Sequence, residues 1–134
     1  MRPIATISSG RLISKLQEGA PLAVVDVRDD DRAGGHIKGS IHVPSHDFRR
    51  RLPSLLIELQ SNEAVVFHCM MSQRRGPSCA SAFAKSLDDA AERHAIGTIP
   101  DVLLLEGGFM AFARHYSEET KTLYEHFQRS EYGV

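Results

Sequence analysis

Short apolar runs alternate with segments of helical period along most of the chain, and this alternation is what most constrains the fold. The apolar runs at residues 22–27, 63–68 and 101–105 each have the length of a buried strand. Between them, apolar residues recur at helical spacing over 52–59 and 80–91. Strands that alternate with helices predict an α/β fold with a central, mostly parallel sheet, rather than a β-sandwich or a helical bundle.

Local signals predict where several of these elements begin and end. Ser9 is a suitable N-cap for a helix over residues 10–18, which Gly19 would end. Residues 29–35 are polar and rich in glycine, and they predict a loop or a single helical turn. Pro53 is placed in the first turn of its predicted helix, where proline is tolerated. Two short helices are expected to close the chain.

The size and composition of the chain suit one domain. With 134 residues, of which 42% are hydrophobic, residues 1–134 can form a single catalytic domain with its own core. The formal net charge of -1 gives no general attraction to nucleic acid or to an anionic membrane. The apolar runs are too short to span a bilayer, and two cysteines are too few for a disulfide framework. A reducing compartment is therefore expected, either the cytoplasm or the nucleus.

The segment from His68 to Pro77 carries the residues with the most distinctive chemistry. Five residues separate Cys69 from Arg75, and the segment lies between a predicted strand and a helix that begins near Gly76. That position is the carboxyl end of the sheet, where open α/β folds bind ligands. Backbone N–H groups that curl toward a helix N-terminus form a concave site for a tetrahedral oxyanion. The segment therefore predicts an anion-binding loop.

The thiol and the guanidinium of this loop have complementary chemistry. The helix terminus and the charge of Arg75 should favour the thiolate form of Cys69. Arg75 can bind two oxygens of a phosphate in a fork and stabilise the charge that develops there. Cys69 would then attack the phosphorus and form a cysteinyl-phosphate that water hydrolyses. A bare Cys-x5-Arg spacing favours a buried structural cysteine, so it is the setting between strand and helix that favours the nucleophile.

Two further segments resemble the signatures of the rhodanese-like fold. Residues 24–28 (VVDVR) with 35–41 (GHIKGSI) and Pro44 resemble the first signature, and residues 103–109 (LLLEGGF) with Phe112 resemble the second. Together with the loop, they identify the chain as a member of the branch that holds the M-phase inducer (cell-division-cycle) dual-specificity phosphatases and the eukaryotic arsenate reductases. The resemblance implies a three-layer fold with about five strands, mostly parallel and flanked by helices.

The resemblance also implies the class of substrate. Sulfurtransferases of this fold carry a loop one residue shorter, so phosphate or arsenate is expected here rather than sulfane sulfur. The main expectation is a phosphatase for phosphotyrosine, or for both phosphotyrosine and phosphoserine/threonine, acting on a phosphorylated protein or a small aryl phosphate. One alternative is an arsenate reductase in which Cys69 attacks arsenate and the external thiols glutathione and glutaredoxin complete the reduction. Another is a phospho-binding module without turnover.

The chain departs from the M-phase inducer pattern at two positions. Those enzymes typically carry a glutamate just before the loop arginine, a proposed proton donor, whereas this chain has Arg74. Their protective second cysteine in the Asp-x-Arg strand is replaced by Val27. The missing acid favours a phenolic leaving group, which needs less protonation than an alkoxide. The run 29–31 (DDD) and Glu106 could supply an acid, but both are expected to be solvated loop charges.

The remaining site residues have more modest predicted roles. His68 is predicted to support the loop through hydrogen bonds, and Asp26 and Arg28 to be structural. Cys79 is expected to pack in the helix after the loop rather than to resolve a disulfide. The histidines lack zinc-site spacing, so neither a metal nor a bound cofactor is expected. The residues predicted to bind the oxyanion, with the two methionines as an apolar rim, are Met70, Met71, Ser72, Gln73, Arg74 and Arg75.

Overall fold

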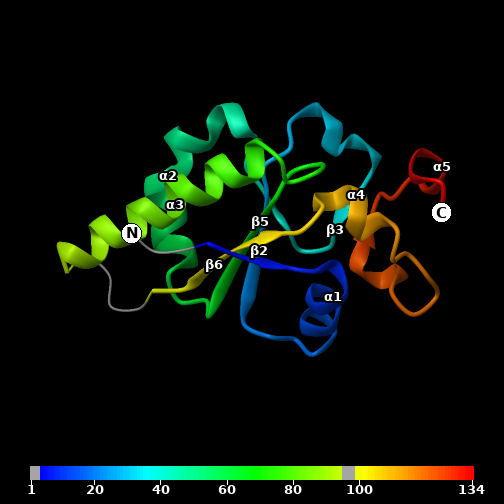
Figure 1. Cartoon of the computed structure of the whole chain (residues 1–134), viewed down its shortest axis with the longest axis horizontal. Coiled ribbons are helices and arrows are strands. Elements are labelled where there is room, and N and C mark those ends of the chain that lie inside the picture. Colours follow the sequence, from blue (N-terminus) through cyan, green and yellow to red (C-terminus); the bar gives the residue numbers. More distant parts are fainter. Residues whose placement is uncertain (1–3, 95–98) are drawn as a thin grey trace.

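A five-stranded sheet forms the middle of three layers in the computed structural model, which describes residues 4–94 and 99–134 (Figure 1). All neighbouring strands are parallel, in the order β1-β6-β5-β2-β4. The strands are β1 (Ala5–Ile7), β2 (Leu22–Asp26), β4 (Ile41–His42), β5 (Ala64–His68) and β6 (Asp101–Leu105). The predicted α/β fold with about five mostly parallel strands is confirmed.

Helices cover both faces of the sheet. On one face lie α2 (Phe48–Leu59) and α3 (Arg75–Glu92), and on the other lie α1 (Ser9–Gln17) and α4 (Gly108–Ala113). Alternate residues of each strand belong to different core clusters: Val25 and Phe67 face α2 and α3, and Val24 and Val66 face α1 and α4. Strands buried on both faces explain why the sequence shows continuous apolar runs instead of strict alternation.

The start of a helix differs from prediction at two places. Ser8, not Ser9, caps α1, because the Ser8 Oγ accepts a hydrogen bond from the Arg11 N–H at 3.2 Å. Pro53 lies inside α2 rather than in its first turn, because the helix already begins at Phe48. The missing N–H of Pro53 leaves the carbonyl of Arg49 without its helical donor, and exposure of Arg49 to solvent makes this tolerable.

A second, two-stranded sheet ties the C-terminal segment to the middle of the chain. It pairs β3 (His36–Ile37) with β7 (Tyr124–Glu125) in antiparallel fashion. Gly35, at φ 124°, brings the backbone so close to Phe127 that a Cβ would lie 2.7 Å from the Phe127 Cα. The strands are too short to show a periodicity, and the sequence did not predict them. The four-residue α5 (Arg129–Tyr132) follows β7.

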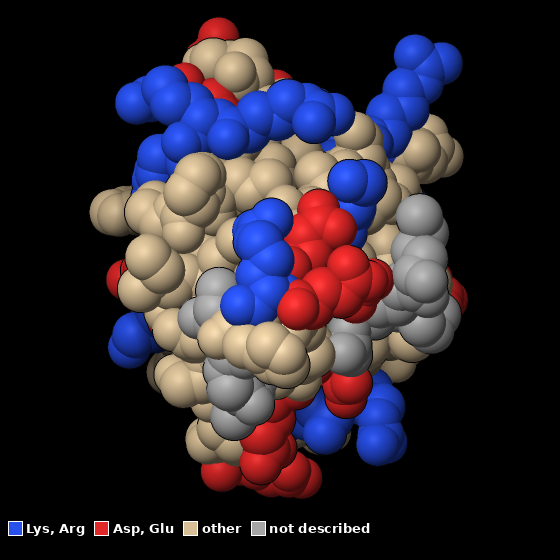
Figure 2. Space-filling view, turned by 90° about the vertical axis from the view of Figure 1, so that its left-hand side faces the viewer, with Lys and Arg blue, Asp and Glu red and all other residues tan. Residues whose placement is uncertain are grey.

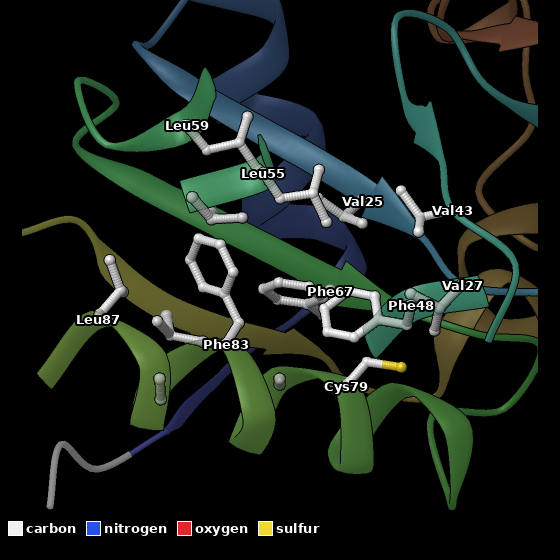
Figure 3. Packing of buried hydrophobic residues seen from close by; sticks show 14 of the residues in the cluster. Val25, Val27, Val43, Phe48, Leu55, Leu59, Phe67, Cys79, Phe83 and Leu87 are labelled. Atoms are coloured by element: carbon white, nitrogen blue, oxygen red, sulfur yellow. The ribbon is translucent and has the colours of Figure 1, made fainter. Parts of the chain in front are cut away.

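Aromatic packing joins α2 and α3 to the sheet. The ring of Phe67 on β5 lies 5.9 Å from that of Phe48 on α2 and 5.2 Å from that of Phe83 on α3. The Cys79 side chain points from α3 into this same cluster (Figure 3). The apolar residues at helical spacing over 80–91 predict an inner face of Ala80, Phe83, Ala84, Leu87 and Ala91, and this face is confirmed except at its end, where Ala90 rather than Ala91 is buried.

Charge is not segregated at the end of the molecule where the strands begin. Figure 2 shows basic and acidic side chains in neighbouring groups on this end, with uncharged surface between them. Such mixing agrees with the formal net charge of -1 and gives this end no field of a single sign. Across the described residues, no helix has both the length and the apolar character needed to cross a membrane.

Replacing Phe83 with alanine should lower the free energy of unfolding by about 3–5 kcal/mol, because it leaves a cavity between α3 and β5. Urea denaturation followed by circular dichroism measures this change. The matched control is Ile57→Ala on the outer face of α2, where the side chain is 72% exposed and the expected change is about 0.5 kcal/mol or less. Equal losses for the two variants would contradict the packing described here.

Candidate active site

The carboxyl ends of four parallel strands bring distant segments of the chain together. The loop 69–75 follows β5, the 3-10 helix η1 (Asp30–Gly34) follows β2, and the 3-10 helix η2 (Ser45–Asp47) follows β4. Gly107 and the start of α4 follow β6. The loop therefore lies at the edge of the sheet predicted from the sequence, with β2 and β6 on either side of its own strand.

The first turn of α4 orients the start of the loop. The Phe109 N–H donates to the Cys69 carbonyl at 3.0 Å, and the Met110 N–H donates to the Met70 carbonyl at 2.9 Å. Because the N–H of a trans peptide points opposite to its C=O, the amides of Met70 and Met71 point away from α4. Within residues 4–94 and 99–134 neither amide donates to another backbone group, so both are available to an anion.

Gly108 makes this approach of α4 possible. Its φ of 62° lies in the left-handed region, and a Cβ there would meet the Met70 oxygen at 2.5 Å and the Cys69 oxygen at 2.7 Å. Gly108, which belongs to the segment 103–109 that resembles the second signature, thus provides a contact surface for the loop.

The first turn of α3 lies against the thiol. A Cβ on Gly76 would stand 3.4 Å from the Cys69 nitrogen and 3.5 Å from the Cys69 Sγ. Cys69 is buried, with 3% of its surface exposed. The positive end of the helix dipole is therefore close to the sulfur.

A hollow of about 240 Å³ opens over the loop. Met71 is half exposed at its edge, whereas Met70 is partly buried, with its sulfur 3.9 Å from the Tyr132 hydroxyl. Ser72 does not line the hollow: it has φ 55°, and its buried Oγ has no hydrogen-bond partner among the described residues. The structure thus brings together all but Ser72 of the predicted loop residues, and the lining residues are Cys69, Met70, Met71, Gln73, Arg74 and Arg75.

The guanidinium of Arg75 is bound by a carboxylate of η1 and by the carboxylate of Asp29, which directly precedes η1. Its Nη1 donates to Asp31 Oδ1 at 2.8 Å and its Nη2 to Asp31 Oδ2 at 2.6 Å, and Nη1 also donates to Asp29 Oδ2 at 3.3 Å. These hydrogen bonds lower the pKa of Asp31 and raise that of Arg75. The expectation that Asp29 and Asp31 are solvated loop charges is wrong, whereas Asp30 and Glu106 are exposed as expected.

Asp29 is held from a second side by η2. The Ser45 hydroxyl donates to Asp29 Oδ2 at 2.8 Å, and the His46 Nδ1 donates to Asp29 Oδ1 at 3.0 Å. Burial by itself would raise the pKa of Asp29, but the hydrogen bonds from Ser45, His46 and Arg75 lower it. Segments after β2, β4 and β5 are therefore joined through one carboxylate.

A buried polar group lies behind the loop. Arg28 binds Asp26 through Nη2 at 2.8 Å and Nε at 3.1 Å, and neither side chain is exposed. His68 is also fully buried, and its Nδ1 donates to the Cys69 carbonyl at 3.0 Å. Burial lowers the pKa of His68 even though Asp26 lies nearby. This arrangement agrees with a supporting position for His68 and with structural roles for Asp26 and Arg28.

Cys79 packs in the core next to the site. It is 6% exposed, and burial together with the nearby Cys69 raises its pKa to about 11, so it stays a neutral thiol near neutral pH. Both cysteines are free. Within residues 4–94 and 99–134, no group of three His, Cys, Asp or Glu side chains is arranged to hold a metal ion.

Comparison with known proteins decides the family. Residues 9–115 match the family of rhodanese-like domains. The chain belongs to this family. Arsenate reductase 2.2 of Oryza sativa subsp. japonica is 38% identical over 109 residues, covering 81% of this chain and 81% of that protein. The dual specificity phosphatase Cdc25 of Arabidopsis thaliana is 37% identical over 109 residues, covering 81% of this chain and 72% of that protein.

Among solved structures, Ygr203w, a yeast protein tyrosine phosphatase of the rhodanese family, aligns with a TM-score of 0.80 at 28% identity. The alignment covers 98% of this chain and 99% of that one. These relatives confirm the resemblance of this rhodanese-like domain to the phosphatases and arsenate reductases of the fold.

In this rhodanese-like domain, Gly108→Ala should lower the free energy of unfolding by about 1–3 kcal/mol more than Gly19→Ala, because a Cβ at Gly108 collides with the loop carbonyls. Gly19 is the matched control, since its φ of 71° carries a similar backbone cost but nothing lies within 4 Å of its Cβ position. Guanidinium denaturation of both variants checks the difference. Indistinguishable midpoints would refute the close approach of α4 to the loop.

Proposed function

We propose that this rhodanese-like domain is a cysteine-dependent phosphatase for phosphotyrosine, or for phosphotyrosine and phosphoserine/threonine. The observation that carries the proposal is the placement of Cys69 under the N-terminus of α3, in one hollow with Arg75. The outward-pointing loop amides and the guanidinium are hydrogen-bond donors for the three equatorial oxygens of a phosphoryl group during its transfer. The phosphatases of Arabidopsis and yeast described above support the same activity.

The proposed reaction has two steps at Cys69. In the first, the Cys69 thiolate attacks the phosphorus, an S–P bond forms, and the P–O bond to the leaving group breaks with its electron pair on that oxygen. In the second, water attacks the phosphorus, the S–P bond breaks, and inorganic phosphate and the thiolate are released. Arg75 and the amides of Met70 and Met71 stabilise the charge on the equatorial oxygens in both steps. The scheme needs neither a metal nor a bound cofactor.

The surroundings of the loop favour aryl over alkyl phosphates. Arg74 occupies the position of the expected acid, and a guanidinium keeps its protons instead of transferring one to a leaving group. Hydrogen bonds from Ser45, His46 and Arg75 lower the pKa of Asp29, and the hydrogen bonds from Arg75 lower that of Asp31, so both are poor proton donors as well. A phenolate leaves without protonation more readily than an alkoxide does. A phosphotyrosine-bearing protein or a small aryl phosphate is therefore the proposed substrate, and the cytoplasm or nucleus the proposed location.

Wild-type protein should hydrolyse para-nitrophenyl phosphate and a phosphotyrosine peptide at least about tenfold faster, in kcat/KM, than the matching phosphoserine peptide. Release of inorganic phosphate measures the three rates. Cys69→Ser should abolish hydrolysis, whereas Cys79→Ser, which alters the other buried thiol, should retain it. Tight phosphopeptide binding without turnover by wild-type protein would instead support a binding module.

A second candidate function is arsenate reduction, favoured by the 38% identity to the rice arsenate reductase. Arsenate shares the shape and charge of phosphate, so the same loop amides and Arg75 suit it. The Cys69 thiolate would attack arsenic and displace water. Glutathione would then attack the Cys69 sulfur and form a mixed disulfide. The S–As bond breaks with its electron pair on arsenic, which is thereby reduced from the pentavalent to the trivalent state and released. Glutaredoxin and a second glutathione would restore the thiol.

If this second function holds, arsenite should accumulate only when glutathione and glutaredoxin are both supplied, and Cys79→Ser should turn over as fast as wild type. External thiols then do the resolving, as expected when Cys79 is a buried neutral thiol. Arsenite formation is measured by separation of the two arsenic species. A Cys79→Ser variant that forms arsenite at less than about a tenth of the wild-type rate would assign the resolving role to Cys79.

A further inference from the structure

The geometry points to Asp31, assisted by Asp29, as a positioning residue that presents one edge of the Arg75 guanidinium to the bound oxyanion. This inference rests on the proposed function and extends it to residues outside the loop. Asp31 touches neither the nucleophile nor the hollow, and it would act through Arg75 alone.

The hydrogen bonds from Arg75 to the two carboxylates determine which edge of its guanidinium can still bind an anion. A guanidinium carries five N–H donors in a fixed plane. The end-on fork to Asp31 takes one hydrogen of Nη1 and one of Nη2, and Asp29 takes the other Nη1 hydrogen. Nε–H and the second Nη2–H have no acceptor among the described residues, and they lie parallel on one side of the plane. Two parallel donors form a second fork, suited to two oxygens of a phosphate or arsenate.

The carboxylates are themselves fixed in place. Asp31 Oδ1 accepts the Asp29 N–H at 3.0 Å, and Asp29 accepts from Ser45 and His46 as well as from Arg75. The clamp, defined as Asp29 and Asp31, is therefore anchored to η2 and to its own backbone. An anchored clamp removes rotamer freedom from Arg75 before the anion arrives, so less ordering cost remains to be met on binding.

A competing role for Asp31 predicts the opposite change in anion affinity when its charge is removed. If Asp31 only competed with the anion for Arg75, its neutralisation would free the guanidinium and tighten anion binding. If Asp31 positions Arg75, the same change weakens binding by about three- to tenfold, the equivalent of ordering one long side chain. Whether anion binding weakens or tightens thus distinguishes the positioning role of Asp31 from the competing one.

The test measures binding of inorganic phosphate by calorimetry in a Cys69→Ser parent, in which no turnover occurs. Adding Asp31→Asn should weaken binding about three- to tenfold. Asp30→Asn, a change of the same charge at the exposed neighbour in η1, should leave binding unchanged. Unchanged or tighter binding with Asp31→Asn overturns the inference, as does a parent that folds but binds no phosphate.

A second background shows whether Asp31 acts through Arg75. Lysine cannot form the fork, so in Cys69→Ser/Arg75→Lys protein the addition of Asp31→Asn should change phosphate binding less than twofold. A loss as large as in the arginine background would mean that Asp31 acts by another route. Thermal melting of each variant confirms that it is folded.

Failure of the clamp and failure of the phosphatase activity give different results. If wild type hydrolyses aryl phosphate but Asp31→Asn leaves phosphate binding intact, the proposed function is supported and the positioning role of Asp31 is refuted. If wild type hydrolyses none of the phosphate esters while Asp31→Asn weakens phosphate binding, the positioning role of Asp31 is supported and the phosphatase activity is refuted.

Discussion

The buried ion pair between Asp26 and Arg28 holds together the elements on which the loop rests. Arg28 Nη2 also donates to the Gly35 carbonyl at 2.8 Å, and the guanidinium lies 4.3 Å from the centre of the Phe109 ring. The end of β2, the turn before β3 and the first turn of α4 are thereby fixed to one another. Removal of the Asp26 carboxylate would leave the buried charge of Arg28 unpaired, at a cost of about 3–5 kcal/mol, so Asp26 keeps Arg28 in the position from which it contacts all three segments. Phe109 in turn binds the Cys69 carbonyl, so this constraint reaches the thiol.

The site has an uneven distribution of charge that follows from this scaffold. On the side of α3 there are a helix N-terminus, Arg74 and the loop amides, all suited to an anion. On the side of η1 there are two carboxylates that share one guanidinium. A dianion held between them gains from the first side and is repelled by the second. Arg75 stands at the boundary, so its orientation decides how much of its charge the anion receives.

The sequence was sufficient for features that depend on local pattern. The buried strands follow from apolar runs, and the loop follows from Cys69 and Arg75 between a strand and a helix. Features that depend on strand order could not be predicted from the sequence. Asp31 reaches Arg75 only because β2 lies beside β5, and no periodicity encodes that neighbour relation. The two-residue strands of the second sheet are likewise set by tertiary pairing, because they are too short to carry a pattern.

Both proposed activities use the same loop, and they differ in what they require from the residues around it. Dephosphorylation of an alkyl ester needs an acid, and the hydrogen bonds that the carboxylates near the loop accept lower their pKa values and keep them ionised. Arsenate reduction has no comparable demand, since the displaced water can take its proton from solvent, but it needs a second thiol. Cys79 is buried in the aromatic cluster, so that thiol has to come from outside (Figure 3). The ionised carboxylates of the clamp therefore narrow the phosphate esters that this site can hydrolyse, but they put no comparable limit on arsenate reduction, which needs no acid from the protein.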